Sequence, residues 1–92
     1  MLKPEFTGKF KRDYKAALKR GLKSSELETV VTILCREEPL PSQYRDHSLN
    51  DSKDYKNMRE CHINPNWLLI YQIQKENLIL KLVRTGSHSD LF

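Results

Sequence analysis

The spacing of apolar residues changes once along this chain of 92 residues, and the change limits the folds that the chain can adopt. In the first third of the sequence apolar side chains recur every three or four residues, as in amphipathic helices. After residue 58 they alternate or cluster, as in strands. A chain of this length holds a single hydrophobic core. We therefore expect residues 1–92 to form one α+β domain.

Two helices are predicted in the first half of the chain. Apolar side chains form one helical stripe between residues 9 and 20, and Gly21 is a typical left-handed residue after a helix. The second helix is expected to start at a capping box formed by Ser25 and Glu28, and prolines at 39 and 41 stop it. Since only a few residues join them, the helices are predicted to form an antiparallel hairpin that packs on an apolar surface.

Four strands are predicted around this hairpin. A short one covers residues 2–7, and three more cover residues 58–63, 67–73 and 78–84. Polar residues 42–56 are predicted to form a surface loop, and the tail after Arg84 is expected to fold back onto the sheet. The predicted order is β-α-α-β-β-β. The helical hairpin packs on one face of a small, mostly antiparallel sheet, and the other face is open.

Positive charge is concentrated in the first quarter of the chain. The whole sequence has 16 Lys and Arg against 12 Asp and Glu, a net charge of +4. A basic helix face favours contact with nucleic-acid phosphates, and a solvated surface is the alternative interpretation. The basic residues that surround the apolar stripe of the first helix are Lys9, Lys11, Arg12, Lys15, Lys19 and Arg20.

The sequence predicts a cytoplasmic protein with no membrane contact. No apolar stretch approaches the roughly 18 residues that a membrane-spanning helix needs, and the first residues form no apolar signal peptide. One of the two cysteines, Cys35, lies in a helix pattern and the other, Cys61, in a strand pattern. We therefore expect two reduced thiols.

Three histidines, at positions 47, 62 and 88, dominate the chemistry of this sequence. No metal site is expected, because Cys61 and His62 are neighbours in a strand and point to opposite faces. Ser87, His88 and Asp90 lack the strand–turn–helix context of a serine hydrolase. No cofactor is expected either, since the three glycines are scattered and form no phosphate-binding loop.

Metal-free cleavage of RNA fits these residue types better. The ribose 2′-OH can attack its own phosphodiester, so an enzyme needs only to remove one proton, supply another and stabilise the phosphorane. Histidines transfer protons near neutral pH, and the planar guanidinium of Arg84 suits two phosphate oxygens. Trp67, Tyr71 and Phe92 offer aromatic faces for unstacked bases, and core packing is an equally good interpretation for Tyr71.

Three ordered segments of this chain resemble the YafQ branch of the RelE/ParE toxin superfamily. They are residues 44–49 (YRDHSL), 59–71 (RECHINPNWLLIY) and 84–92 (RTGSHSDLF). The resemblance covers nearly the whole chain, including the predicted β-α-α-β-β-β order. It implies a toxin of a type II toxin–antitoxin system, namely a ribosome-dependent endoribonuclease that cuts translated mRNA. It also implies a cognate antitoxin of the DinJ/RelB kind that silences the toxin.

The resemblance also implies roles for individual residues. His88 corresponds to the principal catalytic histidine and Arg84 to the arginine that neutralises the phosphate, while the two supporting histidines are His47 and His62. The residues expected to contact RNA are Glu60, Asn66, Trp67 and Phe92. Asn66 stands where the family often has an aspartate, so it can orient a histidine but cannot take its proton. We expect the basic residues of the first helix to bind ribosomal RNA.

Two other functions agree with parts of the sequence. A ParE-like toxin shares the fold but poisons DNA gyrase by binding, and it does not need the histidines or the tail from residue 84 to residue 92. A generic RNA-binding module of α+β type should interleave aromatic and basic residues on a strand, yet residues 67–73 contain no Lys or Arg. The mRNA endonuclease is therefore the leading prediction.

Overall fold

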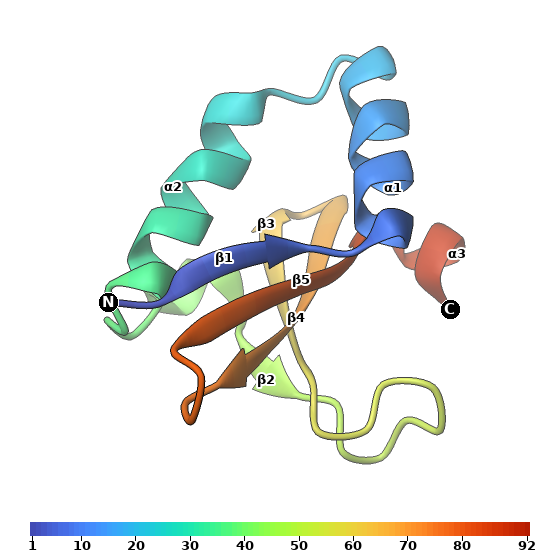
Figure 1. Cartoon of the computed structure of the whole chain (residues 1–92). Helices are drawn as coiled ribbons and strands as arrows, with labels where there is room; N and C mark the ends of the chain where they lie inside the picture. Colours follow the sequence, from blue (N-terminus) through green and yellow to red (C-terminus); the bar gives the residue numbers. More distant parts are fainter.

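The computed structural model describes all 92 residues, and its sheet has the strand order β1-β5-β4-β3-β2 (Figure 1). The elements are, in chain order, β1 (Lys3–Phe6), α1 (Gly8–Lys19), α2 (Ser24–Cys35), the 3-10 helix η1 (Ser42–Tyr44), β2 (His47–Ser48), β3 (Arg59–Asn64), β4 (Trp67–Gln74), β5 (Ile79–Gly86) and α3 (His88–Leu91). Only β1 and β5 pair in parallel. The predicted α+β class and the mostly antiparallel sheet are confirmed.

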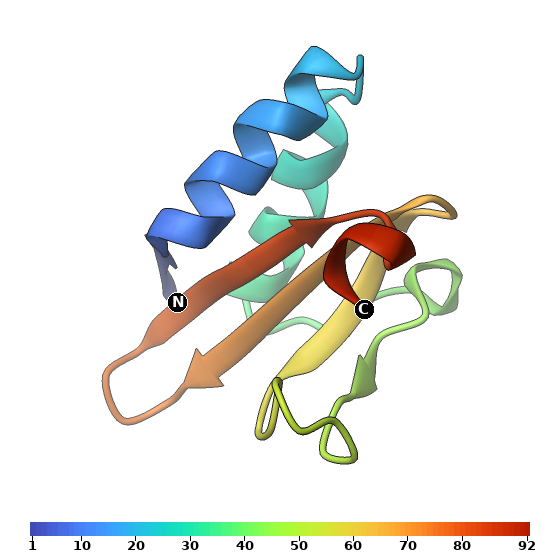
Figure 2. The ribbon, with the colours of Figure 1, turned by 90° about the vertical axis from the view of Figure 1, so that its right-hand side faces the viewer.

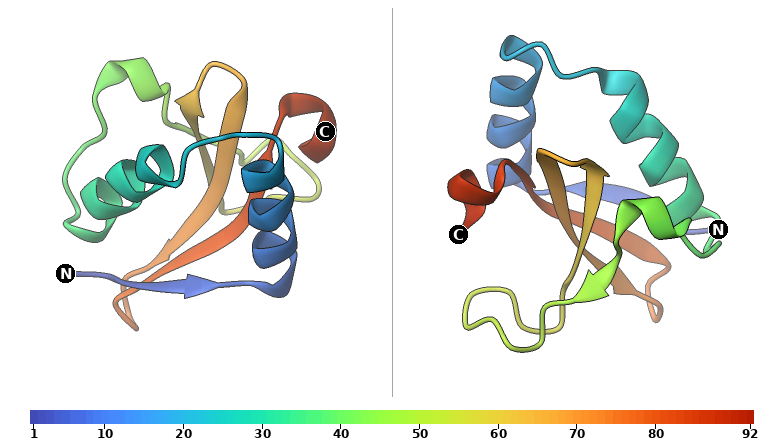
Figure 3. Two further views of the ribbon diagram at one scale, coloured as in Figure 1. Left: turned by 90° about the horizontal axis from the view of Figure 1, so that it is seen from above. Right: turned by 180° about the vertical axis from the view of Figure 1, so that it is seen from behind.

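Both long helices cover the same face of the sheet (Figure 2). Their apolar stripes pack against the strands in a cluster of 14 buried residues that includes Phe10, Val30, Leu69 and Leu82. Figure 3 shows that α1 and α2 are joined at one end and separate toward the other, so the predicted helical hairpin is an open V. No helix of the structure is long and apolar enough to span a membrane.

The helix α1 replaces β1 along the second half of β5. There the hydroxyl of Thr7 donates to the carbonyl of Val83 at 2.9 Å, and it also caps α1 by accepting a hydrogen bond from the N–H of Phe10. Further along the helix, Asp13 accepts a hydrogen bond from the N–H of Thr85 at 3.2 Å. Side chains of α1 therefore satisfy backbone groups at an edge that β1 leaves unpaired.

The start of α2 differs from the prediction. Lys23 is the N-cap without a side-chain hydrogen bond, and Ser25 already lies inside the helix, so the capping box expected between Ser25 and Glu28 does not form. Leu22 packs against the core cluster, and this contact brings the chain into the helix directly after it. The predicted left-handed residue is confirmed, since Gly21 has a φ of +92°.

The second sheet face is partly covered, which corrects the prediction of an open face. Tyr55, Leu68, Ile70 and Leu91 form a separate buried cluster on it. Tyr55 belongs to the segment between β2 and β3 and Leu91 to α3, and Figure 2 shows both segments on the side opposite to α1 and α2. The tail thus folds back onto the sheet as predicted, but as a helix of four residues.

The predicted surface loop at residues 42–56 also contains regular structure. Both η1 and β2 lie within it. The strand β2 has two residues and pairs His47 with Glu60 and Ser48 with Arg59. A strand this short produces no apolar alternation, so the sequence pattern did not indicate it.

Candidate active site

Strand register places the polar residues of the second sheet face in two neighbouring rows. The first row crosses four strands and contains His47, Glu60, Ile70 and Arg84. The next row contains His62, Leu68 and Gly86. Because neighbouring strands lie about 4.8 Å apart, each row gathers residues from distant parts of the sequence within roughly 15 Å.

Glu60 lies between two imidazoles. Its Oε1 is 3.4 Å from Nε2 of His47 and 3.7 Å from Nε2 of His62. The Glu60 side chain is 7% exposed, whereas those of His47 and His62 are 50% and 23% exposed. The carboxylate therefore forms the floor of the site and the imidazoles reach toward solvent. A carboxylate in this position can orient both imidazole rings.

The segment that carries His47 is fastened from the other side of the sheet. Nδ1 of His47 is 2.8 Å from the carbonyl oxygen of Arg45, so both ring nitrogens face oxygen acceptors. The neighbouring Asp46 accepts a hydrogen bond from Nη2 of Arg59 at 3.0 Å and another from the hydroxyl of Tyr71. Burial and the hydrogen bond to Asp46 raise the pKa of Tyr71, so its hydroxyl stays protonated. These contacts fix the two residues of β2 against β3.

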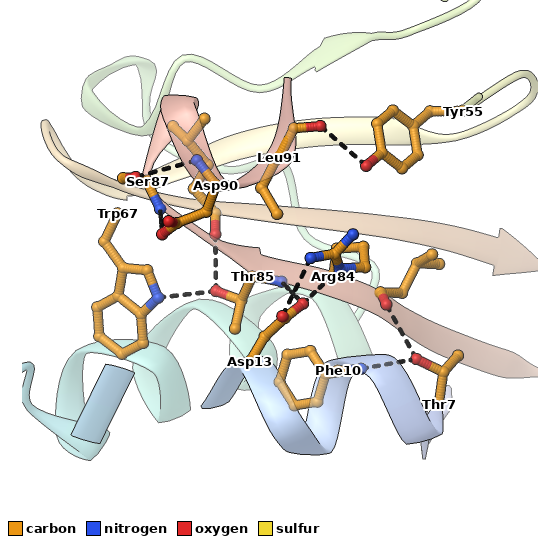
Figure 4. Close-up of polar contacts among 12 residues, drawn as sticks. Thr7, Phe10, Asp13, Tyr55, Trp67, Arg84, Thr85, Ser87, Asp90 and Leu91 are labelled. Carbon is orange, nitrogen blue, oxygen red and sulfur yellow. Dashed lines mark hydrogen bonds and ion pairs between the residues drawn. The ribbon is translucent and has the colours of Figure 1, made fainter. Parts of the chain in front are cut away.

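His88 is the first residue of α3, and it is exposed. Its ring stacks on that of Phe92 with a centroid distance of 5.0 Å, and Phe92 also meets the ring of Tyr55 edge-on at 5.5 Å. The hydroxyl of Tyr55 donates to the carbonyl of Leu91 at 3.1 Å (Figure 4). The buried Tyr55 and Leu91 therefore hold α3 on the sheet, while His88 and Phe92 remain at its surface.

The turn from β5 into α3 depends on a capping box and a glycine. The hydroxyl of Ser87 accepts a hydrogen bond from the N–H of Asp90, and the Asp90 carboxylate accepts one from the N–H of Ser87 at 2.8 Å (Figure 4). The hydrogen bonds from Ser87 lower the pKa of Asp90. Gly86 has a φ of +156°, and a Cβ there would lie 3.0 Å from atoms of Asp90. Only glycine fits between the end of the strand and the helix.

Arg84 has a protein partner that the sequence did not predict. Its Nε and Nη2 donate to the two carboxylate oxygens of Asp13 on α1, at 2.5 Å and 3.1 Å (Figure 4). The two side chains are 24% and 18% exposed. The hydrogen bonds to Asp13 raise the pKa of Arg84 above its usual value, so the guanidinium is permanently charged. An arginine has five N–H donors, and Asp13 uses only part of this set.

Trp67 is a core residue, which corrects its prediction as an RNA contact. The indole is 0% exposed and belongs to the cluster beneath α1 and α2. Its Nε1–H donates to the hydroxyl of Thr85 at 2.7 Å, and that hydroxyl donates to the carbonyl of Leu68 (Figure 4). No face of this ring is available to a base. Since both faces of β4 are covered, alternation along the strand did not show that both of its aromatic rings are buried.

The remaining predicted residues lie on the surface. The six basic residues of α1 and its C-cap are all exposed, and one of them, Arg20, pairs with Asp90 at 3.0 Å and so connects α1 to α3. Asn66 is exposed in the turn between β3 and β4, and the preceding Pro65 borders a small cleft of about 140 Å³ together with His62. The contacts of these residues with RNA stay predictions.

Sequence reasoning missed three residues that position the site, namely Asp13, Asp46 and Tyr55. Asp46 lies beside His47 in a segment that the sequence singled out, whereas neither of the other two gave a signal. No group of three or more His, Cys, Asp or Glu side chains is placed to hold a metal ion. The site instead combines imidazoles and a guanidinium on one sheet face, groups that can exchange protons and neutralise a phosphate.

Known proteins resemble this chain over nearly its whole length. A family model described as "Bacterial toxin of type II toxin-antitoxin system, YafQ" matches residues 2–92. The mRNA interferase toxin YafQ of Escherichia coli (strain B / BL21-DE3) is 38% identical over 89 residues, which cover 96% of this chain and 92% of that protein.

Solved structures have the same fold. A metal-bound toxin from Helicobacter pylori matches with a TM-score of 0.92 and 46% identity over 100% of both chains. A chain of the DinJ-YafQ complex of E. coli matches with a TM-score of 0.87 and 36% identity, over 100% of this chain and 99% of that one. Sequence and structure therefore agree that the chain belongs to the YafQ family of bacterial toxins of type II toxin–antitoxin systems.

Proposed function

We propose that this toxin is an mRNA interferase, an endoribonuclease that cuts translated mRNA on the ribosome and thereby inhibits translation. The observation that carries the proposal is the gathering of His47, Glu60 and His62 on the sheet face that also holds α3, with His88 and Phe92 at its surface. The activity is the one in the name of the E. coli relative, mRNA interferase toxin YafQ. A toxin that acts by binding alone does not need this set of groups.

The proposed reaction uses the 2′-OH of the message as its nucleophile. A base removes the proton of the 2′-OH, and the oxygen attacks the adjacent phosphorus. The bond from phosphorus to the 5′ oxygen then breaks, an acid protonates that oxygen, and a 2′,3′-cyclic phosphate remains. In this mechanism His88 transfers the proton in one of the two steps, and Arg84 stabilises the charge of the phosphorane.

His47 and His62 differ from His88 in their surroundings. Both face the Glu60 carboxylate at ion-pair distances, whereas His88 makes no ion pair and packs against an aromatic ring. We infer that the first two mainly orient the phosphate, and that His88 is the main proton carrier. Phe92, 51% exposed beside His88, is suited to stack on an unpaired base.

The basic surface of α1 is proposed to bind ribosomal RNA. Its lysines and arginines are exposed and point away from the core, so phosphate contacts would release counterions and give salt-dependent binding. Replacing both Lys11 and Lys15 by Glu should weaken ribosome binding and reduce its salt dependence. Replacing the exposed Lys53 and Lys75, which lie in loops away from α1, is the matched control. Equal effects of the two pairs would contradict a specific role of α1.

An antitoxin of the DinJ kind is the proposed partner, since a related toxin was solved as the DinJ-YafQ complex. We expect the partner to be net acidic, because the toxin carries a net charge of +4 that speeds encounters with an acidic chain. Co-expression with the product of the adjacent gene should give a stable complex and relieve growth arrest. If it gives neither, that gene product is not the antitoxin.

The histidine at the end of the chain provides the main test. His88→Ala should lower the rate of mRNA cleavage on purified ribosomes by about 10²–10⁴, the usual share of one acid–base group. Ser89→Ala changes the next exposed residue of the same helix and should leave cleavage unchanged. We expect His47→Ala and His62→Ala to cost less than His88→Ala. Undiminished cutting by all three histidine variants would refute the acid–base mechanism. Growth arrest with inhibited gyrase and no mRNA cleavage by the wild type would favour the ParE-like alternative.

A further inference from the structure

We propose that Asp13 is a positioning residue that holds Arg84 in the orientation needed to bind the scissile phosphate. This inference rests on the proposed function, in which Arg84 stabilises the charge of the phosphorane. It adds a residue of α1, far from the histidines in the sequence, to the groups on which the reaction depends.

The ion pair leaves the end edge of the guanidinium free of Asp13, on the side where Tyr55 lies. Asp13 takes the side edge of Arg84, made of Nε–H and one N–H of Nη2. The end edge, made of Nη1 and the second N–H of Nη2, presents parallel donors that match two oxygens of a phosphate. In Figure 4, Arg84 lies between Asp13 on one side and Tyr55 and Leu91 on the other. The nitrogen not bound to Asp13 therefore points away from α1, toward the face that carries α3.

Asp13 is itself held in place by the fold. One of its carboxylate oxygens accepts hydrogen bonds from both Nε of Arg84 and the backbone N–H of Thr85. The Thr85 hydroxyl bonds in turn to the carbonyl of Leu68 and accepts the indole N–H of Trp67. The carboxylate is thus tied to the backbone of β5 at the residue after Arg84. An arginine fixed along one edge loses little conformational freedom when it binds a phosphate, so its transition-state contact costs less reorganisation.

The pair also borders solvent, as a ligand contact requires. Asp13 and Arg84 line a groove of about 430 Å³ together with Lys19, Arg20 and Asp90. Asp90 is occupied by Arg20 and by the cap of α3, so Asp13 is the carboxylate of this groove that orients Arg84. Opening the pair would free the guanidinium to rotate while leaving its charge in the groove.

A double-mutant cycle between Asp13 and Arg84 tests the proposal. The variants are Asp13→Asn, Arg84→Ala and the combination, all assayed for single-turnover cleavage on ribosomes well below their melting temperatures. Asn keeps an oxygen for the N–H of Thr85 but removes the charge that fixes Arg84. Glu76→Gln is the matched control, because it removes one exposed acidic charge in the turn at the opposite end of β5.

Arg84→Ala should lower the maximal rate by about 10²–10³, and Asp13→Asn by about tenfold to hundredfold through misorientation. In the Arg84→Ala background, Asp13→Asn should have no further effect, and Glu76→Gln should have none in either background. An independent readout is the ¹⁵N resonance of Arg84 Nε–H, which should shift or broaden in Asp13→Asn.

The possible failures can be told apart. If Asp13→Asn cuts as well as the wild type, or lowers the rate equally with and without Arg84, then Asp13 does not act through Arg84. In the latter case Arg84 keeps its proposed role in the reaction. If Arg84→Ala cuts normally, the proposed role of Arg84 is wrong and the positioning role of Asp13 falls with it.

Discussion

Replacing Trp67 by Phe separates a core role from an RNA-binding role. The substitution keeps an aromatic ring but removes the indole N–H that donates to Thr85 at 2.7 Å, in a site that is 0% exposed. Losing this buried hydrogen bond should cost about 1 kcal/mol. The volume lost in a packed core should add about 1–2 kcal/mol. For a domain of this size the sum corresponds to a melting temperature lower by roughly 10–20 °C.

Thermal unfolding followed by circular dichroism measures the first effect, and ribosome-dependent cleavage at a temperature where the variant is folded measures the second. We expect the melting temperature to fall and the cleavage rate of the folded protein to change less than threefold, a margin of about 0.6 kcal/mol. Phe92→Leu is the opposite control, since it changes an exposed aromatic ring and should lower cleavage with little effect on melting. A Trp67→Phe protein that melts like the wild type but cuts poorly would show that the indole serves RNA binding.

Three further predictions concern other parts of the structure. Gly86→Ala should lower the cleavage rate clearly while the melting temperature changes little, because the added Cβ would press on Asp90 and displace α3. Cleavage at the wild-type rate would contradict this packing. Burial raises the pKa of both Cys35 and Cys61 and so keeps the reactive thiolate scarce at neutral pH. A thiol reagent should therefore label both cysteines slowly in the native state and quickly in denaturant, and fast labelling of the native protein would refute this prediction. Cleavage should persist when a chelator selective for Zn²⁺ and Cu²⁺ is added and ribosomal Mg²⁺ is retained, and a loss reversed by added metal would require a different mechanism.

The elements that periodicity predicted are those whose stability comes from their own apolar pattern. The two long helices and the strands β3, β4 and β5 each present a repeated apolar face to the core, so their types were predicted correctly and only their ends shifted. The start of α2 shifted because Leu22 packs against the core, a tertiary contact that outweighed a capping box. The short elements β2 and α3 contain too few residues for any period to show.

The site residues were predicted from ordered motifs, and the motifs do not say what each side chain contacts. Burial of Glu60 beneath two imidazoles depends on the pairing of β2 with β3, which no local pattern encodes. Trp67 occupies the core because it faces α1 and α2, and alternation along β4 did not distinguish this face from the second one, which Tyr55 and Leu91 cover. The partner of Arg84 was missed for a similar reason, since Asp13 is 71 residues away in the chain.

Two of the proposed functional histidines sit on short regular elements of the chain, and a carboxylate anchors each of these elements. A strand of two residues carries His47 and a helix of four residues carries His88, and neither length is stable by itself. Asp46 binds Arg59 and Tyr71 and fixes the strand. Asp90 caps the helix and pairs with Arg20, and Asp13 holds Arg84 along one edge. In each case the anchor is a short acidic side chain whose partner lies on another element, or on a neighbouring turn of the chain. Precise placement of the proposed proton carriers and of the proposed phosphate ligand therefore depends on the contacts of three aspartates more than on the core. Substitutions at these three aspartates should impair cleavage before they unfold the domain.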